Sequence, residues 1–267
     1  MTTITKRMTR EYLPVLVISF AIAAFFAQTE VSSAQELSLA GKLCAAYEGI
    51  ETITCQIRKT TETGGNSVTM LSRVFYKKQD HVHVENVAPS KRTIIADGKK
   101  LFYHDENAPR GFSKAISELE PSWLTHLKNV PGTPMEHLLK LRNLAETAIP
   151  STQEFPVRRA YQTEKVYVVL SCDSKGRPAQ IDFFQSPDMT RKTAQINYSD
   201  FKEISENCWI PCLHKTVLSA PGGEQIIETR RIDNVVANKP IADSMFSADL
   251  FFKDIEFVSD FKETFNK

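Results

Sequence analysis

The sequence predicts a mainly β protein whose strands form one large antiparallel sheet. Along much of the chain apolar residues alternate with polar ones, which is the pattern of strands that bury one face. Turn residues separate these strands at a regular spacing, without the strand–helix–strand alternation that is typical of parallel sheets. Roughly ten or eleven strands in one domain favour a strongly curved sheet or an unclosed barrel.

The first half of the sheet follows a short helix. Apolar residues at helical spacing predict a helix over residues 37–49, which ends at Gly49. The period then changes to two, because Ile53, Cys55 and Ile57 share one face of the first strand. Further strands are expected over residues 68–77, 81–87, 93–96 and 100–104, so this half of the sheet is a meander.

The stretch TIIADGKKLFYHD, residues 93–105, is a hairpin with apolar residues on both of its faces. Its Asp97-Gly98 pair favours a two-residue turn of type I′, in which both central residues have positive φ. A sheet face in contact with water is normally polar. The apolar residues at 94, 95 and 101–103 therefore require cover on both sides, from helices on one side and from the curling sheet or a ligand on the other.

A proline-rich insert separates the two halves of the sheet. Thr133, Pro134 and Glu136 provide the start signals of a helix, namely a capping residue, a proline at the first position and a capping box. The wide apolar face that follows predicts a helix over residues 134–148. A shorter helix is expected over residues 122–129.

Strands resume beyond this insert and form a second meander. The chain ends in a polar tail whose spaced phenylalanines suggest a loosely docked helix. The strands of the second meander are expected over residues 158–162, 165–172, 179–185, 191–202, 209–218 and 224–236.

The N-terminus has the features of a secretory signal peptide. Basic residues precede an apolar run over residues 13–27, and Ser32 and Ala34 stand at the −3 and −1 positions of a cleavage site. The run is shorter than the roughly 20 residues of a membrane-spanning helix, although an uncleaved anchor is an alternative. We therefore predict a signal peptide at residues 1–34, one domain at 35–253 and the polar tail at 254–267, outside the cytoplasm.

Charge and cysteine content limit the partners of the chain. The formal net charge of +1 argues against binding to nucleic acid and against a polybasic attachment to membranes, and a monomer is expected. Five cysteines leave at least one thiol unpaired or paired between chains. A Cys44–Cys55 bridge is one option, whereas Cys208 and Cys212 are interpreted as buried apolar residues.

No catalytic motif is present in the sequence, so neither an enzyme nor a cofactor is expected. The series His81-Val82-His83-Val84-Glu85 would place two imidazoles and a carboxylate on one face of a strand, as some zinc sites require. A solvent-facing edge is the simpler interpretation, and no metal site is expected. Cys212 and His214 also share a face, but no third group orients them for catalysis.

Segments spread over most of the chain resemble the motifs of one known family. Residues 93–103 resemble its hairpin, and Gly132-Thr133-Pro134-Met135 resembles the start of its lid helix. Residues 175–178, KGRP, are similar to a turn between its strands, and residues 241–246, IADSMF, are similar to its closing segment. This family is the periplasmic outer-membrane lipoprotein carrier family (LolA-like).

The resemblance implies an unclosed, strongly curved antiparallel sheet of about eleven strands with helices plugging its mouth. It implies a periplasmic carrier or binder of lipids or lipid-modified proteins, whose acyl chains lie between sheet and helices. An inner-membrane release complex and an outer-membrane acceptor are its implied partners. An envelope-stress sensor or interaction module on the same scaffold is the alternative. The expected cavity wall consists of Phe75, Val84, Ile94, Phe102, Leu138, Leu139, Leu141, Val169 and Phe183, each of which could also be ordinary core.

One departure from the family pattern concerns the lid. The family usually has Arg-Pro after its third strand, where the arginine latches the lid, but this chain has Lys77-Lys78. Lysine lacks the planar fork that binds a carboxylate through two hydrogen bonds. The chain also has an extra pair of strands, over about residues 208–236. Both features favour the broader description of a lipid or lipoprotein binder.

Overall fold

A computed structural model describes residues 37–219 and 223–265. The predicted signal peptide lies outside the described residues. Among the helices of the described ranges, none combines the length and the apolar character that crossing a membrane requires.

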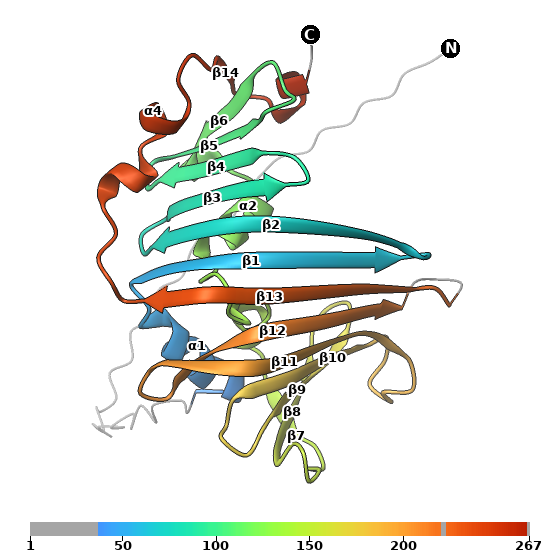
Figure 1. Ribbon diagram of the computed structural model, residues 1–267. Helices are drawn as coiled ribbons and strands as arrows, with labels where there is room; N and C mark the ends of the chain where they lie inside the picture. Colours follow the sequence, from blue (N-terminus) through green and yellow to red (C-terminus); the bar gives the residue numbers. More distant parts are fainter. Residues whose placement is uncertain (1–36, 220–222, 266–267) are drawn as a thin grey trace, which may run out of the picture. The chain divides into compact units, whose positions relative to one another are not determined.

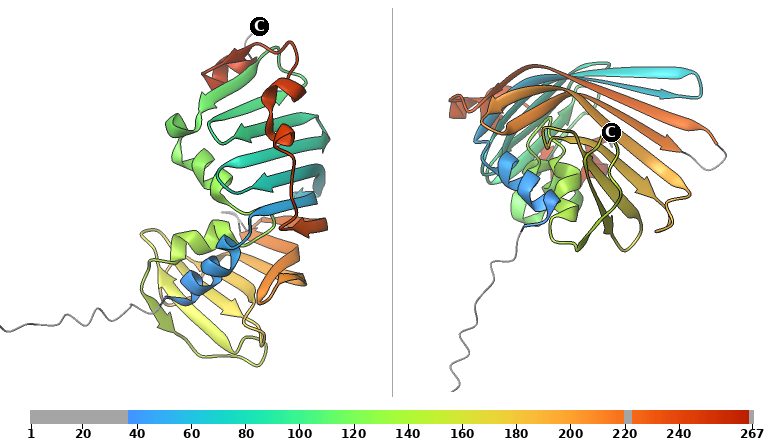
Figure 2. Two further views of the ribbon diagram at one scale, coloured as in Figure 1. Left: turned by 90° about the vertical axis from the view of Figure 1, so that its left-hand side faces the viewer. Right: turned by 90° about the horizontal axis from the view of Figure 1, so that it is seen from below.

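Fourteen strands form one sheet in the described part of the chain, in the order β14-β6-β5-β4-β3-β2-β1-β13-β12-β11-β10-β9-β8-β7. The two meanders join where β1 pairs with β13 (Figure 1). Neighbouring strands are antiparallel throughout, except that β14 runs parallel to β6. The order is open at both ends, so the sheet is unclosed, and it is strongly curved (Figure 2).

The strand count exceeds the predicted number of about eleven because three short strands form in segments that carry no strand pattern. These are β6, β7 and β14, which lie in the proline-rich insert, in the predicted helix and in the polar tail. The strands are β1 (Thr52–Thr63), β2 (Asn66–Lys77), β3 (His81–Ala88), β4 (Arg92–Asp97), β5 (Lys100–Asp105), β6 (Gly111–Ala115), β7 (Glu146–Ala148), β8 (Val157–Gln162), β9 (Tyr167–Cys172), β10 (Pro178–Phe184), β11 (Lys192–Ser205), β12 (Cys208–Ser219), β13 (Gln225–Ala237) and β14 (Phe257–Val258).

Three helices lie on the concave side of the sheet, which we call the inner face (Figure 2). They are α1 (Leu39–Glu48), α2 (Pro121–Lys128) and α3 (Met135–Leu141). Helix α1 begins where the Ser38 hydroxyl accepts a hydrogen bond from Gly41 N at 3.1 Å, which satisfies one of the free amides of the first turn. Its buried side chains Ala40, Cys44 and Tyr47 recur at helical spacing and join the main core.

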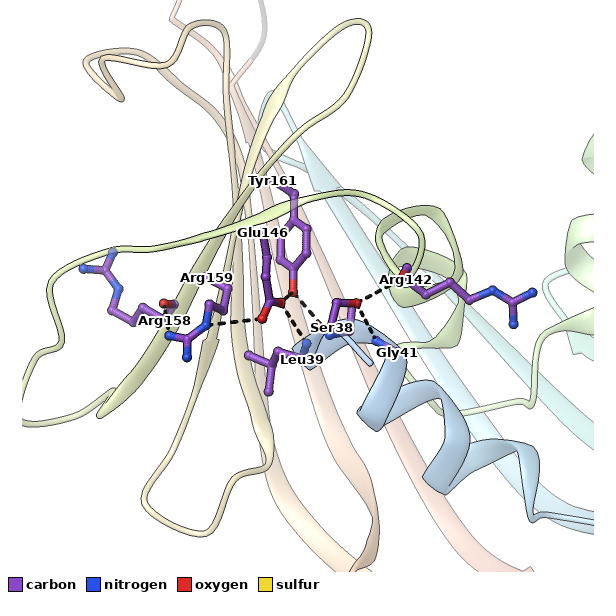
Figure 3. A network of polar contacts seen from close by, with 9 residues as sticks. Ser38, Leu39, Gly41, Arg142, Glu146, Arg158, Arg159 and Tyr161 are labelled. Carbon is purple, nitrogen blue, oxygen red and sulfur yellow. Dashed lines mark hydrogen bonds and ion pairs between the residues drawn. The ribbon is translucent and has the colours of Figure 1, made fainter. Parts of the chain in front are cut away.

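Helix α3 is half as long as the sequence predicts, because tertiary contacts override the helical pattern. The helix ends at Leu141, and residues 146–148 form β7 instead. Glu146 Oε2 accepts hydrogen bonds from Tyr161 Oη at 2.7 Å and from Leu39 N at 2.8 Å, and Arg159 Nε lies 3.5 Å from Oε1 (Figure 3). This network needs Glu146 in an extended segment beside β8, and it holds the start of α1 against the sheet.

The turn of the β4–β5 hairpin also differs from the prediction. Gly98 has a φ of +84°, whereas neither Asp97 nor Lys99 has a positive φ. A glycine with positive φ at the first central position is typical of type II′, so type I′ is wrong. Asp97 Oδ1 stabilises the turn by accepting hydrogen bonds from Lys99 N and Lys100 N at 2.9 and 2.7 Å.

The apolar residues of this hairpin are covered on both sides, as predicted. Ala96, Leu101 and Tyr103 belong to the main core on the inner face. Ile95 and Phe102 belong to a second cluster on the opposite, outer face. The cover there is neither the curling sheet nor a ligand but residues 243–258 of the C-terminal segment, which spans residues 243–265. This segment contains η2 (Asp243–Phe246), α4 (Ala248–Phe251), β14 and η3 (Phe261–Phe265). A further 3-10 helix, η1 (Ile116–Glu118), lies between β6 and α2.

All five cysteines are free thiols, so the Cys44–Cys55 bridge is not formed. Four of them are buried, including Cys208, and Cys212 is half-buried. Burial raises the pKa of Cys44 to about 11 and that of Cys55 to about 12, which keeps both thiols protonated and unreactive at neutral pH.

The substitution Tyr161→Phe tests the network that ends α3 early. It removes a hydroxyl that donates to Glu146 and accepts from Ala40 N at 3.2 Å. We expect the free energy of unfolding in urea to fall by about 1–3 kcal/mol, because the buried amide of Ala40 loses its partner. Tyr167→Phe is the matched control, since the Tyr167 hydroxyl has no hydrogen bond to the described residues. Equal stability of the two variants would contradict this role.

Candidate ligand-binding face

The inner face is incompletely filled by the helices, and one gap lies beside α3. This cavity has a volume of about 570 Å³, within the roughly 300–1,000 Å³ typical of small-molecule sites. Its wall is mainly apolar and combines α3 and the segment after it with the β8–β9 turn, β9 and β10. The lining residues are His137, Lys140, Leu141, Leu144, Thr163, Glu164, Lys165, Val166, Val168 and Phe183.

A second cavity of about 430 Å³ lies on the other side of the connection between α2 and α3. Its floor is apolar and comes from β1 to β4, and its rim is polar. The rim includes Lys59 and Arg230, which both pair with the carboxylate of Glu228 at 2.5 and 2.6 Å. Burial alone would raise the pKa of Glu228, but the two cations lower it, so the rim carries a fixed ionised cluster.

Two imidazoles lie on the inner face, namely the half-buried His137, which lines the first cavity, and the buried His214. The His137 ring contacts Phe183 edge-on, with centroids 5.7 Å apart, and the His214 ring contacts Tyr198 in the same way at 4.9 Å. Burial, together with the positive charge of Arg230, lowers the pKa of both histidines to about 4. Both rings are therefore neutral at pH 7.

Six of the nine predicted cavity residues lie on the inner face. Leu141 and Phe183 line the first cavity, and Val84 and Ile94 line the second. Leu138 is fully buried in the main core, and Leu139 packs against that core. Their contact with a ligand stays a prediction.

The other three predicted cavity residues point to the outer face. Phe75 contacts the His83 ring there, and Phe102 contacts Phe252 and Phe257. Val169 is fully buried in a separate small cluster with Ala160 and Phe184. The assignment of these three to the cavity is wrong, because the two faces of an apolar strand cannot be told apart without its register.

The sequence interpretation also missed residues that do line the first cavity. Val168 lines it in place of its neighbour Val169, and Val166, Leu144 and His137 lie around the same space. A contact between the β8–β9 turn and α3 leaves no periodic signal in the sequence. One signal was available in the sequence. His137 lies on the predicted lid helix, two residues after Met135, and could have been included among the cavity residues.

The alternative zinc and thiol sites are absent from the described residues. His83 and Glu85 do share the outer face, but His83 Nδ1 lies 2.8 Å from Met245 O, beneath the C-terminal segment. No group of metal-ligating side chains that could hold an ion occurs in the described ranges. Burial raises the pKa of Cys212, so a thiolate beside His214 is not favoured.

The position of the missing arginine latch is occupied by other ion pairs. Lys78 Nζ donates to Glu48 O and to Glu51 Oε1 at 3.0 and 2.9 Å, and so ties the end of α1 to β2. Arg142 Nη1 lies 2.9 Å from Glu48 Oε1 and connects α3 to α1. Both partners of this second pair are about half exposed, so the link between the helices is weak.

Comparison with known proteins supports the fold of the chain but assigns no function. No family model and no curated protein match it. A solved structure of a DUF1329 family protein from Desulfovibrio piger ATCC 29098 resembles this chain, with 10% sequence identity and a TM-score of 0.53. The match covers 80% of this chain and 96% of the Desulfovibrio piger protein. At this low identity the likeness shows a shared fold and nothing more. A LolA superfamily protein from Nitrosomonas europaea is another solved structure that resembles this chain, with 13% sequence identity and a TM-score of 0.48. The match covers 79% of this chain and 98% of the Nitrosomonas europaea protein.

The predicted architecture, an unclosed and strongly curved antiparallel sheet, is confirmed. The Desulfovibrio piger protein shares this fold. At such low identity a shared fold transfers no ligand and no partner, so function has to be argued from the inner face itself.

The buried histidines give a prediction for acid stability. The unfolded chain protonates each histidine near its ordinary pKa of about 6.5, whereas the folded chain does so only near pH 4. Between these values the unfolded state binds more protons, so the free energy of unfolding should fall as the pH drops from about 7 to about 4. Urea titrations across this range measure the slope.

The matched variants are His214→Gln and His81→Gln. Replacing His214 should flatten the slope, because one of the two buried imidazoles is removed. His81, which is only partly buried on the outer face, gives the comparison for loss of a histidine away from this site. An unchanged slope in His214→Gln would show that its imidazole is not held neutral.

Proposed function

We propose that this protein is a periplasmic carrier or binder of lipids or lipid-modified proteins, processed after Ala34, that holds acyl chains on the inner face of its sheet. The observation that carries the proposal is the mainly apolar cavity of about 570 Å³ between α3 and strands β9 and β10. The secretory leader in the sequence supports a location outside the cytoplasm. The role is physical binding and release, with no catalytic step.

The size of the cavity suits part or all of one acyl chain. Burying a methylene is favourable by roughly 0.8 kcal/mol, so a 16-carbon chain would gain on the order of 12 kcal/mol if fully covered. A carrier with that affinity could not release its cargo. The helices would provide the counterweight if the ligand displaces α3, because Leu138 and Leu141 of α3 are buried in the main core and would lose that burial.

The polar groups around the first cavity suggest where the head of a ligand lies. Lys140 and Lys165 line it together with a single carboxylate, Glu164. The tail would lie against Val166, Val168 and Phe183, and the head would stay at the solvent side near the lysines. Negatively charged amphiphiles are therefore expected to bind more tightly than neutral ones.

The substitution Val166→Asp tests the acyl cavity. Val166 is half-buried at the cavity wall, so a carboxylate there should weaken the binding of a fluorescent fatty-acid probe at least tenfold without unfolding the chain. Val236→Asp is the control, because Val236 is 46% exposed on β13. Its binding should equal that of the unchanged protein.

Two outcomes would contradict the proposal. If the unchanged protein ignores acyl probes altogether, the cavity is not a lipid site. If instead it binds the periplasmic segment of a membrane protein stoichiometrically and without lipid, the sensor alternative is favoured.

A further inference from the structure

The C-terminal segment crosses from one face of the sheet to the other around the edge of β6. Its η2 and α4 lie over the outer face of β3 and β4 (Figures 1 and 2). It then pairs with β6 in parallel through β14, where Phe257 aligns with Gly111 and Gly111 N donates to Glu256 O at 2.8 Å. Beyond β14 the segment reaches the inner face.

Two phenylalanines four residues apart hold this segment to the two faces. On the outer face the Phe257 ring lies 5.4 Å from both Phe102 and Phe252. On the inner face the Phe261 ring enters an aromatic slot formed by Tyr103, Phe112 and Trp123. The centroid distances to these three rings are 5.3, 5.6 and 6.1 Å.

The outer half of the site is shaped for an aromatic ring. A Cβ atom placed on Gly111 would lie only 2.5 Å from Phe257 Cε1 and 2.7 Å from Cδ1. Glycine at this position therefore leaves the space that the ring occupies. Arg110 Nε lies 3.6 Å from Glu256 Oε2, so a carboxylate directly before the ring is also accommodated.

The hold on the segment is weak for a sheet element. The pairing covers only two residues, and Phe261 and Phe265 remain 39% and 50% exposed. Thr264 is fully buried, yet its hydroxyl has no partner among the described residues, which costs stability. Because β14 is an edge strand that pairs only with β6, it can leave without breaking any other pair of strands in the described sheet.

We infer that the edge of β6 and the aromatic slot together form a docking site for an extended segment of a partner protein, and that residues 256–261 occupy this site in the resting state. The partner segment would carry an acidic residue, an aromatic residue and a second aromatic residue four positions later. Main-chain hydrogen bonds to β6 would give affinity, and the two ring sites would give specificity. Because residues 256–261 belong to the same chain as the site, their effective concentration is on the order of millimolar. A partner segment must bind tightly enough to displace them.

The test uses a fluorescein-labelled peptide with the sequence of residues 254–265, DIEFVSDFKETF, and full-length protein. The double variant Phe257→Ala/Phe261→Ala vacates the site, so we expect it to bind the peptide at least tenfold more tightly than the unchanged protein in fluorescence anisotropy. Adding Gly111→Ala should abolish the gain, because the new Cβ fills the ring site. Phe265→Ala should behave like the unchanged protein.

Several results would overturn the inference. One is equal peptide binding by the unchanged protein and the double variant, and another is a gain that persists with Gly111→Ala. A third is a gain in fatty-acid binding without a gain in peptide binding, which would make the slot part of the lipid site. If the double variant fails to fold by circular dichroism, Phe261→Ala alone decides, with an expected gain of at least threefold.

Discussion

The structure depends on the need to cover both faces of a sheet whose strands are apolar on both sides. The β4–β5 hairpin shows this most clearly, since Ile95 and Ala96 are adjacent, face opposite ways and are both fully buried. Water on either face would expose one of them. Segments far apart in the sequence provide the cover, with helices on the inner face and residues 243–258 on the outer face. The positions of α1 to α4 follow from this requirement.

The inner cover is incomplete, and this incompleteness gives the molecule its candidate function. Helix α3 has only seven residues, because Glu146 is drawn into β7 by Tyr161 and by the first amide of α1. So short a helix cannot cover the full width of β9 and β10, and the first cavity remains beside it. A longer α3 would fill this space with its own side chains. The polar network in Figure 3 therefore helps to determine where a ligand can lie.

The sequence predicted features that depend on local pattern. The helix expected over residues 37–49 is α1 and ends at Gly49, the helix at residues 122–129 is α2 within a residue, and the two meanders occur in the predicted order. The errors occur where distant contacts decide. Residues 146–148 look helical but pair with β8, and Gly98 alone has the positive φ that was expected of both Asp97 and Gly98. Phe102 and Val169 were given the wrong face because alternation is lost when both faces are apolar.

The central claim is that the inner face holds acyl chains, and lipid analysis of the purified protein tests it most directly. Folded protein is extracted with organic solvent, and the extract is examined by mass spectrometry alongside protein of the Val166→Asp variant. We predict acyl-bearing molecules at a substantial fraction of one per chain from the unchanged protein, and clearly less from the variant. Extracts without acyl chains, or with equal amounts from both proteins, would contradict the claim.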